Sequence, residues 1–380
     1  HLSPPPRTYA SGRTAATWLM ATPSSWGSSA EEGRDWSSLP DPALFSIATS
    51  LAASLADVLA FARVCRAWSS LAAANENLLM ASLPPFLFRD RDADLYCPAD
   101  GRRYRNTRLA ALLEEGEGGP VEAVGGSFGH VIVVPSTASA DRRTFSVVNP
   151  LTGTLACRFP PNSRPIVRWA ALSSPPASPD CAIWSSDGYF VELCRRGDQR
   201  WSTCPFQGAH LIPRPVFLHG KGYLDHQTKL AAFDTNPRTQ LTILPARASP
   251  VSARFPELSL CASDSELLLI SVVRYRGSGS IKKFLVYIFD FSVADWVRLH
   301  SLGDRALFCV CDVFGAALSV RTPGSWGGCG SCIYFADLRD DELGVFHLPD
   351  GKIECLVRGY PSEPMLSGQS PVWILPSMCY

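Results

Sequence analysis

The sequence lacks features that several large classes of protein need. Its 35 Lys and Arg residues balance its 35 Asp and Glu residues, so the formal net charge of zero provides no field that would concentrate nucleic acid. The longest apolar run, Leu267 to Val273, is far shorter than the ~20 residues that span a bilayer, and it predicts a buried strand instead. We therefore expect neither a nucleic-acid partner nor a membrane partner.

Motifs of common catalytic and cofactor sites are also scarce. The chain has no Gly-x-x-x-x-Gly-Lys-Ser/Thr, Gly-x-Gly-x-x-Gly or His-Glu-x-x-His motif, and its seven His residues are scattered. One group of cysteines has metal-ligand spacing, since Cys309 and Cys311 are followed by Cys329 and Cys332. Because Cys332 opens an expected strand, we interpret these residues as structural cysteines. We expect no catalytic residue, no metal and no cofactor.

The first residues differ in composition from the rest. Residues 1–35 are rich in Ser, Pro, Ala and Gly and are expected to form a disordered tail, although a plastid or mitochondrial presequence has a similar composition. The chain contains 13 Cys but no Asn-x-Ser/Thr sequon. A long chain of this kind is more typical of a reducing compartment than of a disulfide framework.

Three short amphipathic helices are predicted between residues 36 and 82. Asp41 can cap a first helix with Pro42 at its first position, and Ser54 opens a sequence that resembles a capping box for a second. A third helix is expected over Val64–Leu79. Three short helices in about 45 residues form only a marginal core, so this unit should need a partner.

The same segment resembles an F-box. The resemblance rests on a Leu-Pro opening, spaced Leu and Ile residues, an Asp before an aromatic residue and Val-Cys-x-x-Trp, carried by Trp36, Leu39, Pro40, Leu44, Ile47, Leu51, Asp57, Phe61, Val64, Cys65 and Trp68. It implies docking into the groove of a Skp-type adaptor that links the protein to a cullin scaffold. The adaptor-binding residues implied in this way are Leu39, Pro40, Leu44, Ile47, Leu51, Val64, Cys65 and Trp68. The alternative is that this apolar stripe is only the internal core of helices that cap the larger domain.

Beyond Pro85 the pattern predicts an all-β domain built from repeats. Five hairpin units have equivalent apolar points at Val148, Leu193, Phe233, Phe289 and Phe346, separated by 45, 40, 56 and 57 residues. Repeats of roughly 40 to 50 residues that contain short strands are typical of propeller blades. A β-sandwich would rarely need so long a stretch with this period.

The large domain is similar to that of plant F-box proteins with a KIB-type propeller, also called domain of unknown function 295. The resemblance rests on five segments, which are Asn149–Gly153, Gly220–Leu224, Ser301–Phe308, Cys332–Asp337 and Gly344–Phe346. Cys309 and Val310 follow the third segment where that family often has Leu-Gly. The F-box and this domain occur in the order that the family uses.

These interpretations give an α+β multidomain protein, with a small all-α three-helix F-box followed by an all-β propeller of unknown blade number. The expected boundaries are a tail at 1–35, the F-box at 36–82, a linker at 83–124, the propeller at 125–360 and a tail or closing strand at 361–380.

The predicted function is that of a substrate-recognition subunit of an SCF-type ubiquitin ligase, which captures an unidentified target protein in the cytoplasm or nucleus and is not itself catalytic. One alternative is a propeller scaffold without a ligase role. Another is a propeller enzyme with Asp234, Asp290 and His347 at its channel mouth. Turn residues that could meet a target are Trp326, Arg274, Tyr275, Arg276 and His226.

Overall fold

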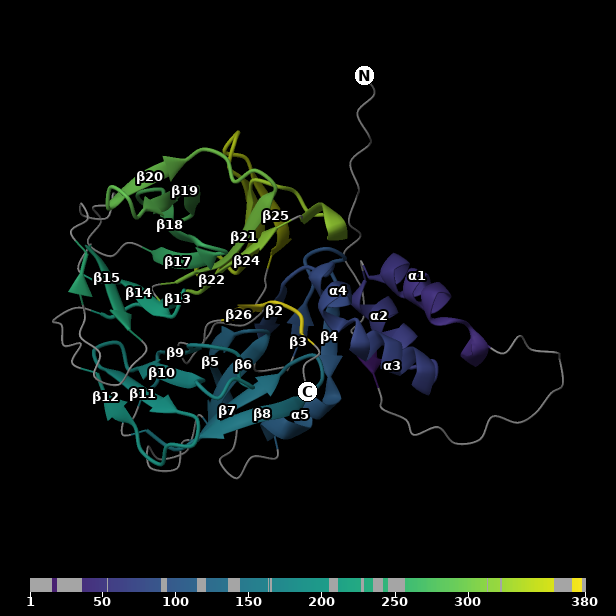
Figure 1. The fold of residues 1–380 in the computed structure, drawn as a ribbon. Coiled ribbons are helices and arrows are strands. Elements are labelled where there is room, and N and C mark those ends of the chain that lie inside the picture. The colour runs from purple at the N-terminus through teal and green to yellow at the C-terminus, as the bar shows by residue number, and fades with distance from the viewer. Residues whose placement is uncertain are drawn as a thin grey trace, which may run out of the picture.

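Helices occupy one side of the molecule and a ring of sheets the other (Figure 1). The computed structural model describes residues 16–18, 36–52, 54–89, 94–114, 121–135, 144–162, 164, 166–204, 211–226, 229–234, 242–244, 257–312, 314–321, 323–358 and 371–377. The tail expected at 1–35 lies outside the described residues except for the strand β1 (Ala16–Trp18). No described helix is long and apolar enough to cross a membrane.

The N-terminal helices form the expected compact module. They comprise a 3-10 turn and four α-helices, namely η1 (Trp36–Ser38), α1 (Asp41–Leu51), α2 (Leu55–Ala62), α3 (Arg66–Ala74) and α4 (Glu76–Ala81). The cap of α2 is confirmed, because the Ser54 hydroxyl accepts a hydrogen bond from the Asp57 N–H at 3.4 Å. The helical elements of the module run from Trp36 to Ala81.

Two details of the helices differ from the sequence prediction. Pro40, not Asp41, is the N-cap of α1, and Asp41 is already the first helical residue. The single third helix is divided at Asn75, whose φ of −115° and ψ of 21° are not helical. The Asn75 amide donates to Leu71 O at 2.9 Å, and such local side-chain bonds compete with helix continuation.

The described strands form six sheets, which are the blades of a propeller, so the predicted fold class is confirmed. Four blades consist of four antiparallel strands in chain order, with the first strand innermost. Blade 2 is β5 (Val121–Ser127), β6 (His130–Pro135), β7 (Phe145–Asn149) and β8 (Thr154–Phe159); blade 3 is β9 (Trp169–Leu172), β10 (Ala182–Ser186), β11 (Val191–Arg195) and β12 (Ser202–Thr203); blade 4 is β13 (Val216–Leu218), β14 (Lys221–His226), β15 (Lys229–Asp234) and β16 (Thr242–Ile243); and blade 5 is β17 (Leu258–Ser263), β18 (Glu266–Arg274), β19 (Ile281–Asp290) and β20 (Asp295–Leu299).

The remaining two blades have five strands each. Blade 1 has the order β26–β2–β3–β4–β1 and comprises β26 (Val372–Ile374), β2 (Phe86–Arg89), β3 (Asp94–Tyr96), β4 (Arg103–Asn106) and β1, which is parallel to β4. Blade 6 has the order β22–β21–β23–β24–β25 and comprises β21 (Arg305–Cys311), β22 (Ala317–Arg321), β23 (Cys332–Asp337), β24 (Glu342–His347) and β25 (Ile353–Arg358). Its β21 and β23 are parallel neighbours. The short helix η3 (Pro323–Trp326) separates β22 from β23.

The predicted repeat corresponds to one position in the blades. Val148, Leu193, Phe233, Phe289 and Phe346 are all buried, and each lies on the strand next to the outermost strand of its blade. The sequence period therefore marks the same structural position in five blades. The sixth was missed because its strands come from both ends of the described chain.

Blade 1 occupies the stretch that was expected to be a linker. Residues 83–124 contain β2 to β4, the helix α5 (Thr107–Glu114) and the start of β5. Of the two possibilities for 361–380, a closing strand is present, because β26 pairs with β2 from Phe86↔Ile374 to Phe88↔Val372. The C-terminal strand thus becomes the innermost strand of the first blade and closes the ring.

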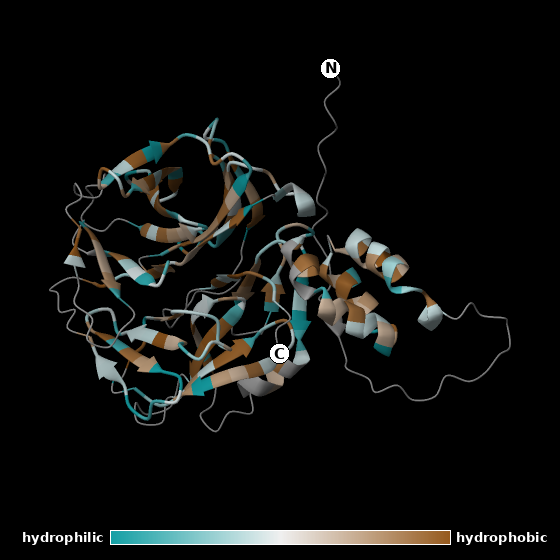
Figure 2. Ribbon diagram, viewed as in Figure 1, coloured by the Kyte–Doolittle hydropathy of each residue, from teal (hydrophilic) through white to brown (hydrophobic). Residues whose placement is uncertain are grey.

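The helices and blade 1 share one hydrophobic core. Leu44, Trp68 and Leu79 of the helices belong to the same buried cluster as Phe86 and Phe88 of β2. Figure 2 shows hydrophobic residues on the helices where they lie beside the propeller, and alternating hydrophobic and hydrophilic residues along many strands. The helical module is therefore attached to the propeller by side-chain packing.

Candidate functional site

The structure separates the predicted adaptor-binding residues by their exposure. In order of increasing exposure they are the buried Leu44 and Trp68, the half-buried Leu39, Ile47, Leu51 and Cys65, and the exposed Pro40 and Val64. The indole N–H of Trp68 donates to Trp36 O at 3.0 Å, and its ring centroid lies 4.6 Å from that of Phe61. Leu44 and Trp68 thus belong to the core of the module, and the other predicted residues are at least partly exposed.

Further apolar residues of the module are exposed. Trp36 and Leu78 are 55% and 51% exposed, close to the 52% of Val64, and Phe45 is also exposed. Contiguous exposed apolar residues are typical of protein-binding surfaces, so these residues are candidates for one. Phe45 could have been singled out, because it replaces a Leu that is usual in the F-box pattern. The sequence did not indicate that Leu78 would be exposed, because this residue was expected within one continuous third helix.

The turn residues of the propeller fall into different environments. Trp326 is buried against Phe308 and Tyr334, with ring centroids 6.1 and 5.5 Å away, so its predicted place on a target-binding surface is wrong. Tyr275 and Arg276 are exposed in the β18–β19 turn, as expected. The side chain of His226 lies outside the described residues.

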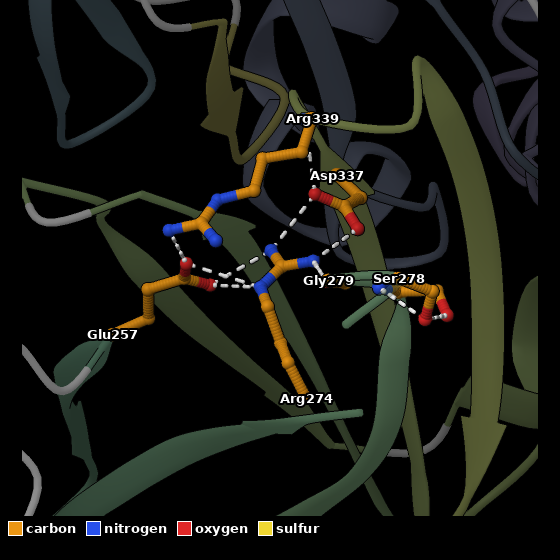
Figure 3. Close-up of polar contacts among 7 residues, drawn as sticks. Glu257, Arg274, Ser278, Gly279, Asp337 and Arg339 are labelled. Carbon is orange, nitrogen blue, oxygen red and sulfur yellow. Dashed lines mark hydrogen bonds and ion pairs between the residues drawn. The ribbon is translucent and has the colours of Figure 1, made fainter. Parts of the chain in front are cut away.

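Arg274 is also not a surface recognition residue, because it lies in a buried ion network between blades 5 and 6 (Figure 3). Its guanidinium donates to both carboxylate oxygens of Asp337 at 2.7 and 2.9 Å and to both of Glu257 at 2.8 to 3.1 Å. Arg339, which is exposed, forms an ion pair with the buried Glu257 at 2.6 Å. Burial lowers the pKa of Arg274, but its hydrogen bonds to Asp337 and Glu257 outweigh burial and raise the pKa overall.

The four cysteines with metal-ligand spacing do not converge. Cys309 and Cys311 belong to the core cluster on one face of blade 6, and Cys332 belongs to the cluster on the other face, while Cys329 is exposed. Burial raises the pKa of the Cys332 thiol to about 12, so it is protonated at neutral pH. Among the described residues no group of three or more possible ligands could hold a metal ion.

The residues considered for a propeller enzyme also lie apart from the channel. Asp234, Asp290 and His347 end the strands β15, β19 and β24, each of which is next to the outermost strand of its blade. Asp290 accepts hydrogen bonds from the Ser292 N–H at 2.8 Å and the Ser292 hydroxyl at 2.6 Å, as a turn-stabilising residue does. These three side chains do not form a channel-mouth site.

A Gly-x-Ser-x-Gly match is present at Gly125–Gly129, but it lies on β5 and its hairpin turn, not on a strand-to-helix turn. The Ser127 hydroxyl accepts from the Leu172 N–H at 3.1 Å. A Cβ on Gly125 would lie 2.0 Å from Ala170 O, and one on Gly126 would lie 2.4 Å from the Val372 side chain. The glycines therefore let three inner strands approach one another.

Comparisons with known proteins agree with this architecture. The family model described as KIB1-4 β-propeller matches residues 96–347. The chain is also similar to the F-box protein At2g17690 of Arabidopsis thaliana, with 39% identity over 70 residues. That alignment covers 18% of this chain and 16% of the length of the Arabidopsis protein.

Solved structures give weaker likenesses. The β-propeller domain of Cps50 (Swd1) from Myceliophteria thermophila has 11% identity and a TM-score of 0.34, covering 69% of this chain and 76% of that one. The computationally designed Ika4 protein has 19% identity and a TM-score of 0.27, covering 44% and 92% of the two chains.

Proposed function

Because the chain belongs to the KIB1-4 β-propeller family, we propose that it is the substrate-recognition subunit of an SCF-type ubiquitin ligase. In this proposal the helical module docks a Skp-type adaptor, the adaptor links it to a cullin scaffold, and the propeller captures a target protein. The protein then works by holding the target near the conjugating enzyme, so it needs no catalytic residue of its own. It would act in the cytoplasm or nucleus, where ubiquitin ligases work.

One observation carries the proposal, namely that the helical module combines a shared core with exposed apolar residues. Part of the module packs into the hydrophobic core that it shares with blade 1, and Trp36, Phe45, Val64 and Leu78 of the module remain exposed. Helices that only cap a propeller would not need this exposed apolar surface, whereas a helical partner groove would cover it. The Arabidopsis relative is named as an F-box protein, which supports the same interpretation.

The test is a pulldown of the purified full chain with a Skp-type adaptor. The variant Val64→Asp places a charge on the exposed surface of the helical module, and Val297→Asp places one on β20 of the propeller, where the valine is 47% exposed. We expect Val64→Asp to abolish adaptor binding and Val297→Asp to leave it unchanged, with similar melting temperatures for both.

A Leu39→Ala, Pro40→Ala double variant gives a second measure, and a loss of binding is expected there too. If the folded wild-type chain does not bind the adaptor, or if both aspartate variants bind as the wild type does, the receptor role is wrong. A propeller scaffold without a ligase role would then be the better description.

A further inference from the structure

The mouth of the central channel holds a small pocket. It lies where the inner strands β5, β9 and β26 begin, beside the loop that joins β21 to β22. Its lining residues include Glu122, Gly125, Arg168, Trp169, Arg214 and Phe314. The pocket thus brings together two arginines, two aromatic residues and one acidic residue from four blades or their connections.

Arg214 is held in place there by neutral acceptors. Its Nη2 donates to Gly126 O and lies 3.4 Å from the Ser127 hydroxyl. The same atom would lie only 3.3 Å from a Cβ on Gly125, so the guanidinium of Arg214 lies directly against β5. Arginine has five N–H donors, so the remaining donors of Arg214 have no partner within the described part of the chain.

Two other partly buried arginines among the described propeller residues are neutralised. Arg274 pairs with Glu257 and Asp337, and Arg305 pairs with Glu266. In contrast, no carboxylate of the described residues forms an ion pair with Arg214. Burial lowers the pKa of Arg214 to about 10, so it remains charged at neutral pH. A partly desolvated charge without a counter-ion is costly, and proteins usually keep one where it meets a ligand.

Arg168 adds a second positive charge to the same pocket. It is exposed, immediately precedes β9, and its side-chain stem lies near Gly188 and Phe314 at the mouth. No carboxylate in the described ranges forms an ion pair with it either. Glu122, at the start of β5, supplies the acidic side chain of the lining, so two guanidinium groups outnumber one carboxylate.

We propose that this pocket binds an oxyanion, a carboxylate or a phosphate group, that projects from the captured polypeptide. Guanidinium groups match the oxygen geometry of such groups, and Trp169 and Phe314 provide an apolar wall beside them. The pocket is small, so it takes one anionic group and not a large ligand. The source of the anion rests on the proposed function, but the affinity of the pocket for an oxyanion does not.

The test uses inorganic phosphate and acetate as probes, added to the full chain at constant ionic strength with chloride as the reference anion. We expect at least one probe to raise the melting temperature in a saturable way. Arg168→Gln should raise the apparent Kd about tenfold, because a charge-assisted hydrogen bond is lost. Glu122→Gln should lower it, because the opposing charge disappears. Arg276→Gln, an exposed arginine of the β18–β19 turn, is the matched control and should change nothing.

The outcomes separate this proposal from the receptor role. A larger effect of phosphate indicates a phosphorylated residue as the natural occupant, and a larger effect of acetate indicates an acidic side chain. If neither anion stabilises the wild-type chain more than chloride does, or if Arg168→Gln and Arg276→Gln behave alike, the pocket is not an oxyanion site.

Arg214→Lys, which keeps the charge, should retain binding even if Arg214→Gln disturbs folding. Adaptor binding by Arg168→Gln should equal that of the wild type, because Arg168 immediately precedes β9 of blade 3 and is not part of the helical module.

Discussion

Two seams of the propeller are joined by different chemistry. At the closing seam, between blades 6 and 1, Trp373 of β26 packs edge-to-face on Phe308 of β21, with centroids 5.1 Å apart, and its indole N–H donates to Cys309 O at 2.9 Å. At the seam between blades 5 and 6, the Arg274 guanidinium lies between the buried carboxylates of Glu257 and Asp337. The first seam shows aromatic packing, whereas the second adds a buried ion network to its apolar core.

Connectivity explains the difference. Blade 1 takes β26 from one end of the propeller and β2 to β4 from the other, so no short loop holds its inner strand in place. Burial of large apolar side chains supplies that attachment. Blades 5 and 6 are consecutive, and there we expect the network to fix the alignment of the blades more than it adds stability, because desolvation offsets much of its attraction. We expect the closing seam to contribute more to the stability of the ring.

The strongest test of this comparison is Trp373→Ala. It removes a buried indole at the closing seam, and we expect the free energy of unfolding to fall by about 4 kcal/mol. Denaturant titration measures the change. The matched control is Trp296→Ala, which removes a half-buried tryptophan from the outermost strand of blade 5 and should cost less than half as much. Equal losses would mean that the closing seam has no special part in stability.

Arg274→Met tests the charged seam and should cost about 3 kcal/mol, because it leaves the Asp337 carboxylate buried without its cation. Arg321→Met is the control, since its ion pair with Asp264 is exposed and should contribute less than about 1 kcal/mol. Combining Arg274→Met with Glu257→Gln and Asp337→Asn should recover most of the loss. A triple variant no more stable than Arg274→Met would show that the ion network itself stabilises the fold.

The two seams also show which parts of the fold could be predicted from the sequence. In blades 2 to 6 a strand and its partner follow each other closely, so period and turn residues predicted the hairpins. Blade 1 was predicted as a linker because its strands β2 to β4 are short and their inner partner β26 is remote in the chain. Such pairing depends on tertiary structure and leaves no local pattern.

The candidate site was predictable to a similar extent. The F-box pattern identified the helices, but the pattern does not separate residues that form the module core from residues on its surface. Only packing against Phe61 and Trp36 places Trp68 inside, and only the ion network places Arg274 between blades. Arg214 gave no signal, because its position depends on the glycines of β5, far away in the sequence.

Asp225 tests a buried charge away from both seams. One carboxylate oxygen of this β14 residue is buried without a hydrogen-bond partner among the described residues, and burial raises its pKa from 3.8 to about 6. A raised carboxyl pKa destabilises the fold at pH values above it, and this penalty disappears as the pH falls from about 7 to 4. Asp225→Asn should therefore add about 1 kcal/mol at pH 7.5 and nothing near pH 4.

Melting curves of both proteins across this pH range measure the effect. Asp290 provides an internal contrast, because hydrogen bonds from Ser292 lower its pKa. Its contribution is present at neutral pH and is lost as the pH falls through its folded pKa, so Asp290→Asn should change the pH dependence in the opposite direction. A pH-independent gain from Asp225→Asn would contradict the assignment.

Ser54→Ala has the smallest expected effect. This variant tests whether the helices and blade 1 unfold together. The Ser54 cap bond is long, so its loss should cost only about 0.5 kcal/mol. Because the helices share a hydrophobic cluster with β2 of blade 1, unfolding of the module should be coupled to opening of the ring. The midpoint should then shift equally when followed by far-UV circular dichroism and by tryptophan fluorescence, and Ser278→Ala in the β18–β19 turn should shift neither. A shift confined to the helical signal would show that the module unfolds independently, and that the closing seam depends on Trp373 without support from the helices.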